Sequence, residues 1–316
     1  DWVIKPGGEI DFDNDGRTVA NDANFQTWSA GIGLRLGQLA LTFNLRSNDY
    51  EIGDIGNRLK LATLEGYAGV AYAFNHGQWN VGIGVGNVGY TALAAVGSTP
   101  DGRQFGKAQY SGLGITAGVL WRPPERPWRL GLALTLPTKT SYRTGPRTFE
   151  AFEAPEHATL PWRLSLGASY RWSFGGHTYN HRIPGTLGWC HTDEVLDRRY
   201  VLFGAELMLV GANPGAVNFE GFASGTPLAT GDAASVVLRV AAESEIIANW
   251  VRVRLGLYNE PNRTAGGLDG VVGRIHGTTS VDLRLFSVAG LKLKLSAGID
   301  IAPRYQNVLF TVGVWN

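Results

Sequence analysis

Four aspartates near the start of the chain have the type and spacing of a calcium-binding loop. Asp11, Asp13 and Asp15 alternate, Gly16 follows them, and Asp22 stands at the twelfth position counted from Asp11. Carboxylates at positions 1, 3, 5 and 12 with glycine at position 6 match the EF-hand loop, except that Asp replaces the usual Glu. The same residues also fit an ordinary Asn-Asp-Gly turn that is rich in carboxylates. Calcium is therefore one hypothesis for this loop, and the sequence requires no cofactor.

The histidines and the single cysteine are the next candidates for chemistry. His177, His181, Cys190 and His191 gather within residues 175–198. Zinc accepts such ligands, but their spacing matches no metal-binding motif, so a merely polar segment is the competing reading. No nucleophile stands next to a base in a catalytic pattern elsewhere in the chain. We therefore predict that the protein is not an enzyme.

The most extensive pattern is a strict alternation of apolar residues with polar or small ones, some of which are charged. Between Trp162 and Phe174, apolar residues hold the even positions, and Arg163, Arg171 and small residues hold the odd ones. Such alternation is typical of β-strands, whose side chains point to opposite faces in turn. If the apolar face meets lipid, the other face lines a lumen. The predicted lumen or pathway residues are Arg35, Arg46, Glu65, Arg163, Arg171, Glu206, Arg239, Glu243, Arg252, Arg254, Arg284, Lys292 and Lys294.

The predicted lumen residues carry both signs of charge on neighbouring strands. Across the expected turn at Asn249, Glu243 and Glu245 adjoin Arg252 and Arg254. Arginine stays charged and pairs bidentately with carboxylates, so it suits such a wall. Two interpretations remain open. The charges form a cross-linked ladder that stiffens the wall, or they form a polar conduction path or a binding site for an anionic headgroup.

About fourteen predicted strands position these residues. Alternating runs cover roughly 22–36, 39–46, 60–75, 78–88, 110–122, 128–137, 162–174, 199–210, 235–247, 250–258, 279–288, 291–301 and 306–315, and a weaker first strand is expected at about 3–13. Short connections are expected at 37–38, 76–77, 123–127, 248–250 and 289–290, and long ones at about 13–22, 47–59, 89–108, 138–160, 211–234 and 259–278. The long segment 175–198 and the short one at 303–306 break the alternation. The pattern predicts an all-β, transmembrane antiparallel β-barrel of the outer-membrane type, with tight periplasmic turns and long outer loops.

The composition agrees with such a wall. Of 316 residues, 44% are hydrophobic, 17% are charged and 43 are glycine, and the mean hydropathy is −0.06. These values exclude a polytopic helical membrane protein and a disordered chain. A net charge of +1 gives no argument for a nucleic-acid partner. Seven tryptophans fall at the expected periplasmic edge, as an interfacial girdle would: Trp2, Trp79, Trp121, Trp128, Trp172, Trp250 and Trp315.

These observations lead to an expected location and a set of expected partners. The chain opens on Asp1, which fits an exported protein whose signal peptide has been removed. We expect a single barrel domain over residues 1–316 in the cell outer membrane of a Gram-negative bacterium. The expected partners are outer-membrane lipids and lipopolysaccharide, a hydrophobic small-molecule ligand or lipid, and envelope proteins that bind through residues 175–198.

Two segments resemble the FadL-type outer-membrane transporters of long-chain fatty acids and hydrocarbons. One spans Gly112 to Tyr142 and contains the run from Gly118 to Pro123, and the other reads RVRLGLYNEP from Arg252 to Pro261. The resemblance implies a barrel of fourteen strands and passive uptake of a hydrophobic molecule that leaves sideways through the wall. The chain departs from the family in its lack of the N-terminal hatch with an Asn-Pro-Ala start, in its shorter length, and in Asn316 following the terminal aromatic.

The sequence thus supports two functional hypotheses. The first is an outer-membrane channel or transporter for small hydrophobic molecules, with passive uptake of the FadL type. The alternative is a non-transporting barrel that anchors or scaffolds an envelope assembly, such as secretion, surface or motility machinery. The long segment 175–198 and the missing hatch motivate the alternative.

Overall fold

A computed structural model describes residues 24–54, 57–96, 106–144, 148–149, 152–153, 156–175, 179–180, 198–217, 229–262, 273–288 and 291–315. The strands are β1 (Asn24–Leu36), β2 (Leu39–Asp54), β3 (Asn57–Phe74), β4 (Trp79–Val96), β5 (Gly106–Trp121), β6 (Trp128–Thr135), β7 (Thr138–Thr144), β8 (Thr148–Phe149), β9 (Phe152–Glu153), β10 (His157–Leu160), β11 (Arg163–Ser173), β12 (Tyr200–Val210), β13 (Ala216–Val217), β14 (Ala229–Thr230), β15 (Ser235–Ile247), β16 (Val251–Glu260), β17 (Arg274–Val288), β18 (Leu291–Ala302) and β19 (Tyr305–Val314). One 3-10 turn, η1 (Asn75–Gly77), joins β3 to β4. No helix among the described residues is long and apolar enough to cross a membrane.

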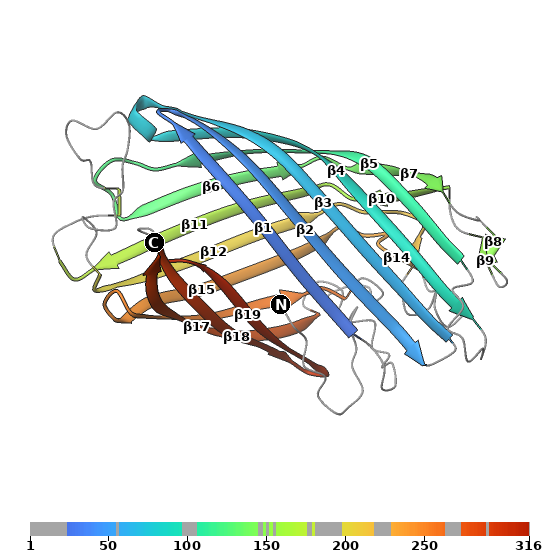
Figure 1. The fold of residues 1–316 in the computed structure, drawn as a ribbon. Helices are drawn as coiled ribbons and strands as arrows, with labels where there is room; N and C mark the ends of the chain where they lie inside the picture. Colours follow the sequence, from blue (N-terminus) through green and yellow to red (C-terminus); the bar gives the residue numbers. More distant parts are fainter. Residues whose placement is uncertain are drawn as a thin grey trace.

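Fifteen of these strands form one antiparallel sheet that curls into a barrel, while β8 pairs with β9 and β13 pairs with β14 in two small separate sheets (Figure 1). Its order follows the chain as β1-β2-β3-β4-β5-β6-β11-β12-β15-β16-β17-β18-β19, and β7 and β10 pair with each other beside this path. Neighbouring strands in the sheet are thus neighbours in sequence, as expected of an up-and-down barrel. The fold class predicted from the alternating pattern is confirmed.

Two of the long strands are interrupted at prolines. β6 stops before Pro137 and continues as β7, and β10 stops before Pro161 and continues as β11. Because β6 pairs with β11 and β7 pairs with β10, the two interruptions lie side by side in the sheet. Proline lacks the N–H that a central strand needs for its ladder, so the pairing breaks there. Counting each interrupted strand once, thirteen strands follow one another around the described wall.

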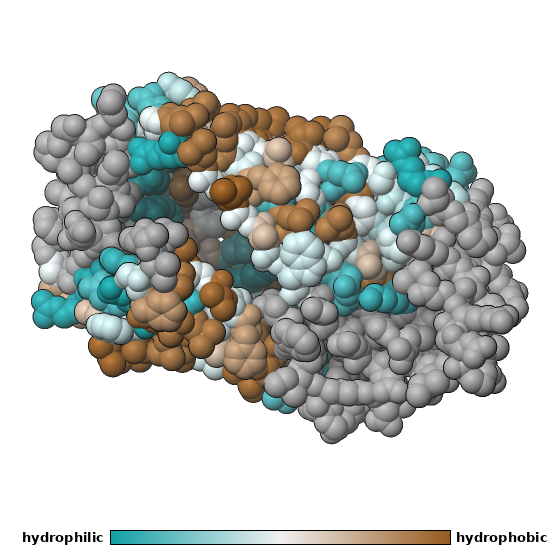
Figure 2. All heavy atoms as spheres, in the orientation of Figure 1, coloured by the Kyte–Doolittle hydropathy of each residue, from teal (hydrophilic) through white to brown (hydrophobic). Residues whose placement is uncertain are grey.

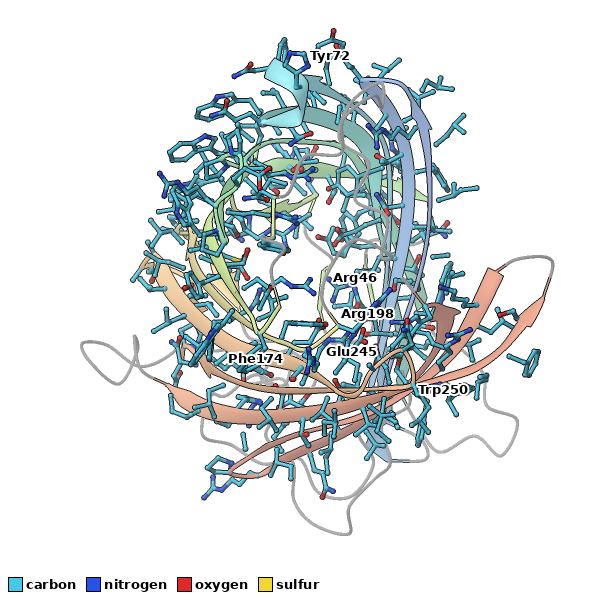
Figure 3. All side chains as sticks on the ribbon, turned by 90° about the vertical axis from the view of Figure 1, so that its left-hand side faces the viewer. Arg46, Tyr72, Phe174, Arg198, Glu245 and Trp250 are labelled. Carbon is cyan, nitrogen blue, oxygen red and sulfur yellow. The ribbon has the colours of Figure 1, made fainter. Side chains whose placement is uncertain are left out.

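The two faces of the wall differ as the alternation predicts. Ile32, Phe43 and Leu255 belong to a large set of exposed apolar side chains on the outer face. Figure 3, which looks along the barrel, shows Arg46, Arg198 and Glu245 on the inner side and Tyr72 and Trp250 on the outer side. Apolar burial against lipid therefore stabilises the outside, and polar contacts must satisfy the inside.

Five of the predicted long loops are partly strand, which corrects the sequence interpretation. β13 and β14 lie within 211–234, and β16 and β17 extend into 259–278. Residues 47–54 extend β2, and the hairpin closes with Asp54 opposite Asn57. Likewise β4 runs on to Val96 and β5 begins at Gly106, while β7 and β10 occupy parts of 138–160. These segments were expected as loops because polar residues such as Ser47, Asn48 and Asp49 follow one another there, without the alternation that marks a strand. The predicted strand at 3–13, the loop at 13–22 and the turn at 289–290 lie outside the described residues.

The first and last strands of the described sheet are its two edges. β1 pairs with β2 alone, and β19 pairs with β18 alone, within the part of the chain that the structure describes. With thirteen strands alternating in direction, β1 and β19 run the same way. Figure 2 shows the surface hollowed between β1 and the C-terminal strands, with hydrophilic residues visible in its depth.

The tryptophans predicted for the periplasmic edge mostly lie on the outer face at the end with short turns. Trp79 stacks on Trp121 with ring centroids 5.4 Å apart, and Trp128 meets Trp121 edge-on at 4.8 Å. Trp315 is the exception, since it is only 3% exposed and lies against the guanidinium of Arg252, 4.6 Å from its ring. Trp315 directly follows β19 and keeps the inward direction of the odd-numbered residues there. The prediction that placed Trp315 in the interfacial girdle was therefore wrong. Trp2 lies outside the described residues.

Candidate functional site on the inner wall

An ion-pair ladder crosses the inner wall from β15 to β18. Glu243 binds Arg254 at 2.6 Å, Arg254 binds Asp282 at 2.9 Å, and Asp282 binds Lys294 at 3.2 Å. The register sets Glu243 directly opposite Arg254, while Asp282 lies opposite Ser296 and reaches Arg254 and Lys294 diagonally. The carboxylate of Asp282 is fully buried between these two cations. This region, β15–β18, is called the ion-pair wall below.

The ladder continues to the end of the barrel that carries the short turns. The buried Glu245 accepts from Arg252 and Arg198 at 3.0 Å each, and its second oxygen accepts from the N–H of Asn249 at 2.9 Å. Asn249 has φ of 65°, a left-handed conformation that asparagine tolerates in a tight turn. One carboxylate thus binds two arginines and fixes the β15–β16 turn.

A second polar cluster lies at the opposite end of the same wall. His276 is 1% exposed, and its two ring nitrogens lie 2.9 Å from Asp300 and 2.9 Å from Glu260. Arg274 also binds Glu260, and Tyr258 donates to Asp300 at 2.7 Å while stacking on the imidazole. These groups come from β16, β17 and β18, so the cluster ties three strands together near the long-loop end.

The arginines on the other side of the barrel have different partners. Arg35 donates to the carbonyl of Gly37 at 3.0 Å, and Arg46 donates to the side chain of Asn48 at 3.2 Å. The guanidinium of Arg171 lies 3.9 Å from the ring centroid of Tyr200. Carbonyls, amides and aromatic rings are thus among the partners of these arginines.

Two residues of the anomalous 175–198 segment dock against this side. Asn180 is fully buried and donates to the carbonyls of Arg126 at 3.0 Å and Trp128 at 2.8 Å. Arg129 donates to the Asn180 side chain at 2.8 Å, and its guanidinium lies 3.4 Å from the ring centroid of Tyr179. The segment is thus attached at residues 179–180 to the turn between β5 and β6.

Glycines leave open space on the inner face of β6, β11 and β12. Gly131 pairs directly with Gly167, and Gly204 lies one strand further on. A Cβ at Gly204 would meet nothing within 4 Å, and one at Gly131 or Gly167 would meet no atom closer than 3.9 Å. None of the three has a positive φ. Neither conformation nor packing requires glycine here, so these positions widen the lumen. This region is called the glycine wall.

The thirteen predicted lumen residues fall into different surroundings. Glu206 pairs with Arg239 at 2.9 Å, and Glu243, Arg252, Arg254 and Lys294 belong to the ladder. Arg284 instead lies 5.3 Å from the ring of Trp250 at the barrel end. Arg35, Arg46, Glu65, Arg163, Arg171 and Lys292 lie at inward positions of the register outside the ladder.

The sequence interpretation missed several inner-wall residues. His276 was expected in a loop but lies in β17, where extending the alternation through Arg274, His276 and Thr278 could have revealed it. Arg129 could have been found from its odd position in the run 128–137. The proposed calcium ligands Asp11, Asp13, Asp15 and Asp22 and the cluster His177, His181, Cys190 and His191 lie outside the described residues.

The fold is similar to those of solved outer-membrane channels. A FadL homologue from Pseudomonas aeruginosa matches at a TM-score of 0.50 with 12% identity over 92% of this chain and 75% of that one. The CymD monoaromatic hydrocarbon channel matches at 0.53 with 12% identity, covering 92% of this chain and 85% of that one. The Pseudomonas putida toluene transporter TodX matches at 0.53 with 10% identity and the same coverages. The resemblance to FadL-type barrels is thereby confirmed for the fold. No family model and no curated protein matches the sequence.

Proposed function

We propose that this protein is an outer-membrane channel for the passive uptake of small hydrophobic molecules in a Gram-negative bacterium. The observation that carries the proposal is the glycine wall, where three inward positions on adjacent strands are open although nothing in the packing requires it. A barrel that served only as an anchor would gain from filling this space, because side-chain contacts inside a wall stabilise it. The similarity of the fold to hydrocarbon channels agrees with this reading.

The ion-pair wall supports the same proposal in another way. Its charges are bound to one another at 2.6 to 3.2 Å. Paired charges attract a polar solute less than isolated ones, and they hold the part of the wall next to the glycine wall rigid. A hydrophobic molecule would then travel along the glycine wall and leave through the wall.

Uptake into proteoliposomes tests the proposal with a matched pair of variants. Gly167→Trp fills the lumen, whereas Leu166→Trp changes the neighbouring residue, which is exposed on the lipid face. We expect radiolabelled toluene and similar small hydrophobic solutes to enter a solute-trapping vesicle faster with the wild type than without protein. Gly167→Trp should lower that protein-dependent rate several-fold, and Leu166→Trp should leave it unchanged. A wild-type barrel that adds no uptake would refute the proposal.

The second candidate, a non-transporting anchor, has one observation in its favour. Asn180 fixes part of the 175–198 segment to the barrel, as a mounted docking loop would require. Deletion of 181–197 that retains Tyr179 and Asn180 is the appropriate variant. Loss of a co-purifying envelope protein, together with unchanged and negligible solute uptake, would favour the anchor over the channel.

A further inference from the structure

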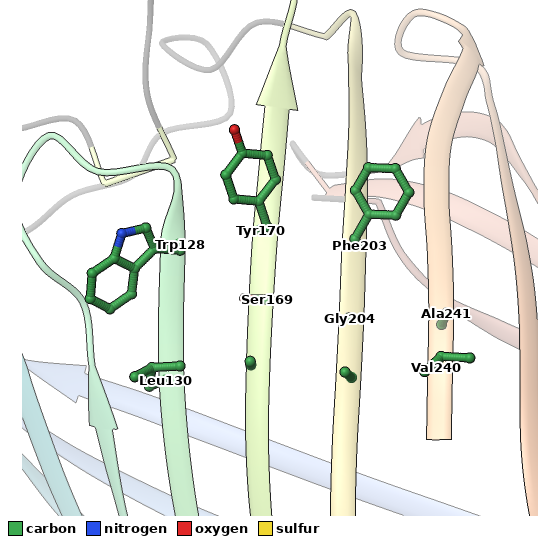
Figure 4. Close-up of a pocket in the computed structure, with 10 residues that line it drawn as sticks. Trp128, Leu130, Ser169, Tyr170, Phe203, Gly204, Val240 and Ala241 are labelled. Carbon is green, nitrogen blue, oxygen red and sulfur yellow. The ribbon is translucent and has the colours of Figure 1, made fainter. Parts of the chain in front are cut away.

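The outer face of the barrel carries two continuous apolar hollows that the proposed transport path does not use. The first has a volume of about 610 Å³, and its lining includes Trp128, Leu130, Tyr170, Phe203 and Val240 (Figure 4). The second, of about 720 Å³, shares Phe203 and Val240 with the first and extends to Leu257 and Ile301. Together they form one groove, here called the outer groove.

Small residues make the floor of the outer groove. Ala168 and Ala205 are cross-strand partners at the bottom of the first hollow, and Ala242 and Gly277 lie in the second. The walls are bulky by contrast, since Leu130, Tyr170 and Phe203 project from the surface. A recess of this kind, with large side chains around a small-residue floor, gives a flexible hydrocarbon chain more contact than a flat wall does.

The outer groove is long enough to hold one acyl chain. The groove crosses β6, β11, β12, β15, β16, β17 and β18. With strands about 4.8 Å apart, six spacings correspond to roughly 29 Å. The hydrocarbon layer of a single leaflet is about 15 Å deep, which is half of the bilayer core of about 30 Å. Because the groove is longer than this depth, an acyl chain that lies obliquely along the wall remains within the groove.

Two arginines stand beside the groove at the end of the barrel with short turns. The N–H of Arg171 bonds to the carbonyl of Pro127 at 2.7 Å, and that of Phe174 bonds to the carbonyl of Arg199 at 3.0 Å. These bonds place Arg126 and Arg199 on opposite sides of the same end of β11, and both side chains are exposed. The outward aromatics Tyr170, Trp172 and Phe174 lead along β11 to this point, as interfacial rings do at headgroup level.

We propose that the outer groove binds an anionic glycerophospholipid of the leaflet at the short-turn end. One acyl chain lies over Ala168 and Ala205, and the phosphate binds Arg126 and Arg199. Guanidinium groups bind phosphate bidentately, which gives the headgroup its position and favours lipids with net negative charge. The site lies on the opposite face of the wall from the lumen, so it does not depend on transport.

Native mass spectrometry of the purified protein in mild detergent tests the site directly. The protein is offered equal amounts of dioleoylphosphatidylglycerol, dioleoylphosphatidylcholine and lipopolysaccharide. We expect one phosphatidylglycerol to be retained, at least fivefold over phosphatidylcholine. Ala168→Phe with Ala205→Phe fills the floor and should lower this retention at least tenfold, while Leu166→Phe, on the same face but outside the groove, should retain the wild-type level.

The arginines provide a second variant that leaves the strands intact. Arg126→Gln with Arg199→Gln should remove the preference for phosphatidylglycerol over phosphatidylcholine. Heat-modifiability on gels shows that each variant is folded. The proposal would be overturned if the protein retained no phospholipid, retained lipopolysaccharide instead, or carried a second copy of the chain on this face. It would also be overturned if the filled-groove variant retained as much phosphatidylglycerol as the wild type, or if the arginine variant kept the preference for phosphatidylglycerol. None of these results depends on whether the barrel transports a solute.

Discussion

Two adjacent regions of the inner wall differ in the side chains that they turn toward the lumen. On the ion-pair wall, inward positions of β15–β18 hold long charged side chains that bind one another, as Glu243, Arg254 and Asp282 do. On the glycine wall, three inward positions of β6, β11 and β12 hold residues with no side chain, at Gly131, Gly167 and Gly204, and the other inward positions include Arg163 and Glu206. One region cross-links its strands, and the other leaves space. The comparison teaches that cross-linking and open space are assigned to different strands of one sheet.

The largest expected effect comes from removing the central carboxylate of the ion-pair wall. Asp282→Ala leaves Arg254 and Lys294 facing each other without the buried group that neutralises them. Breaking a buried pair costs about 3–5 kcal/mol, and we expect about 3 because Arg254 is 35% exposed. Urea unfolding in lipid vesicles, followed by tryptophan fluorescence, measures the loss. A change below 1 kcal/mol would show that the ladder does not stabilise the wall.

A pair of glycine substitutions separates structural glycines from those that only leave space. A Cβ at Gly86 would overlap the carbonyl of Gly66, so Gly86→Ala must displace a neighbouring strand. We expect a loss of about 2 kcal/mol, as for overpacked cores. Gly204→Ala meets open space and should gain about 0.5 kcal/mol by restricting the unfolded chain. The same urea experiment compares the two, and equal effects would remove the distinction on which the glycine wall rests.

The smallest effect is expected where an ion pair is exposed to the lumen. Arg239 and Glu206 lie 2.9 Å apart but keep 47% and 33% of their side-chain surface exposed. Because water screens such a pair, Glu206→Gln should cost less than about 1 kcal/mol. The loss should shrink further as salt is raised from 0.05 to about 0.5 M. A loss as large as that of Asp282→Ala would mean that exposure does not rank the pairs.

Much of the fold could be predicted from the sequence because each membrane-embedded strand meets two different media. Lipid on one side and a polar lumen on the other impose a period of two, which located most strands and the contacts of Glu243 and Glu245 across the Asn249 turn. Residues 47–54 were missed because Ser47, Asn48 and Asp49 are all polar and show no alternation with apolar residues. The contact between Arg198 and Glu245 joins residues 47 positions apart, which no local period encodes.

The glycine wall shows a further limit of sequence reasoning. Inward glycines recur in several strands, and the sequence alone does not tell which are packed and which are open. Gly112 would place a Cβ 2.6 Å from the carbonyl of Lys139, whereas Gly204 would meet nothing. The difference depends on how closely neighbouring strands approach, and therefore on the curvature of the completed sheet.

Photolabelling with a small hydrophobic probe tests the central claim most directly. A diazirine-bearing aromatic is bound to the protein in vesicles and activated, and the labelled residues are identified by mass spectrometry. The account predicts lumen-side labels on β6, β11 and β12 around Gly131, Gly167 and Gly204, and their loss in Gly167→Trp but not in Leu166→Trp. Labels confined to the outer face, or lumen labels on β15–β18 alone, would contradict it.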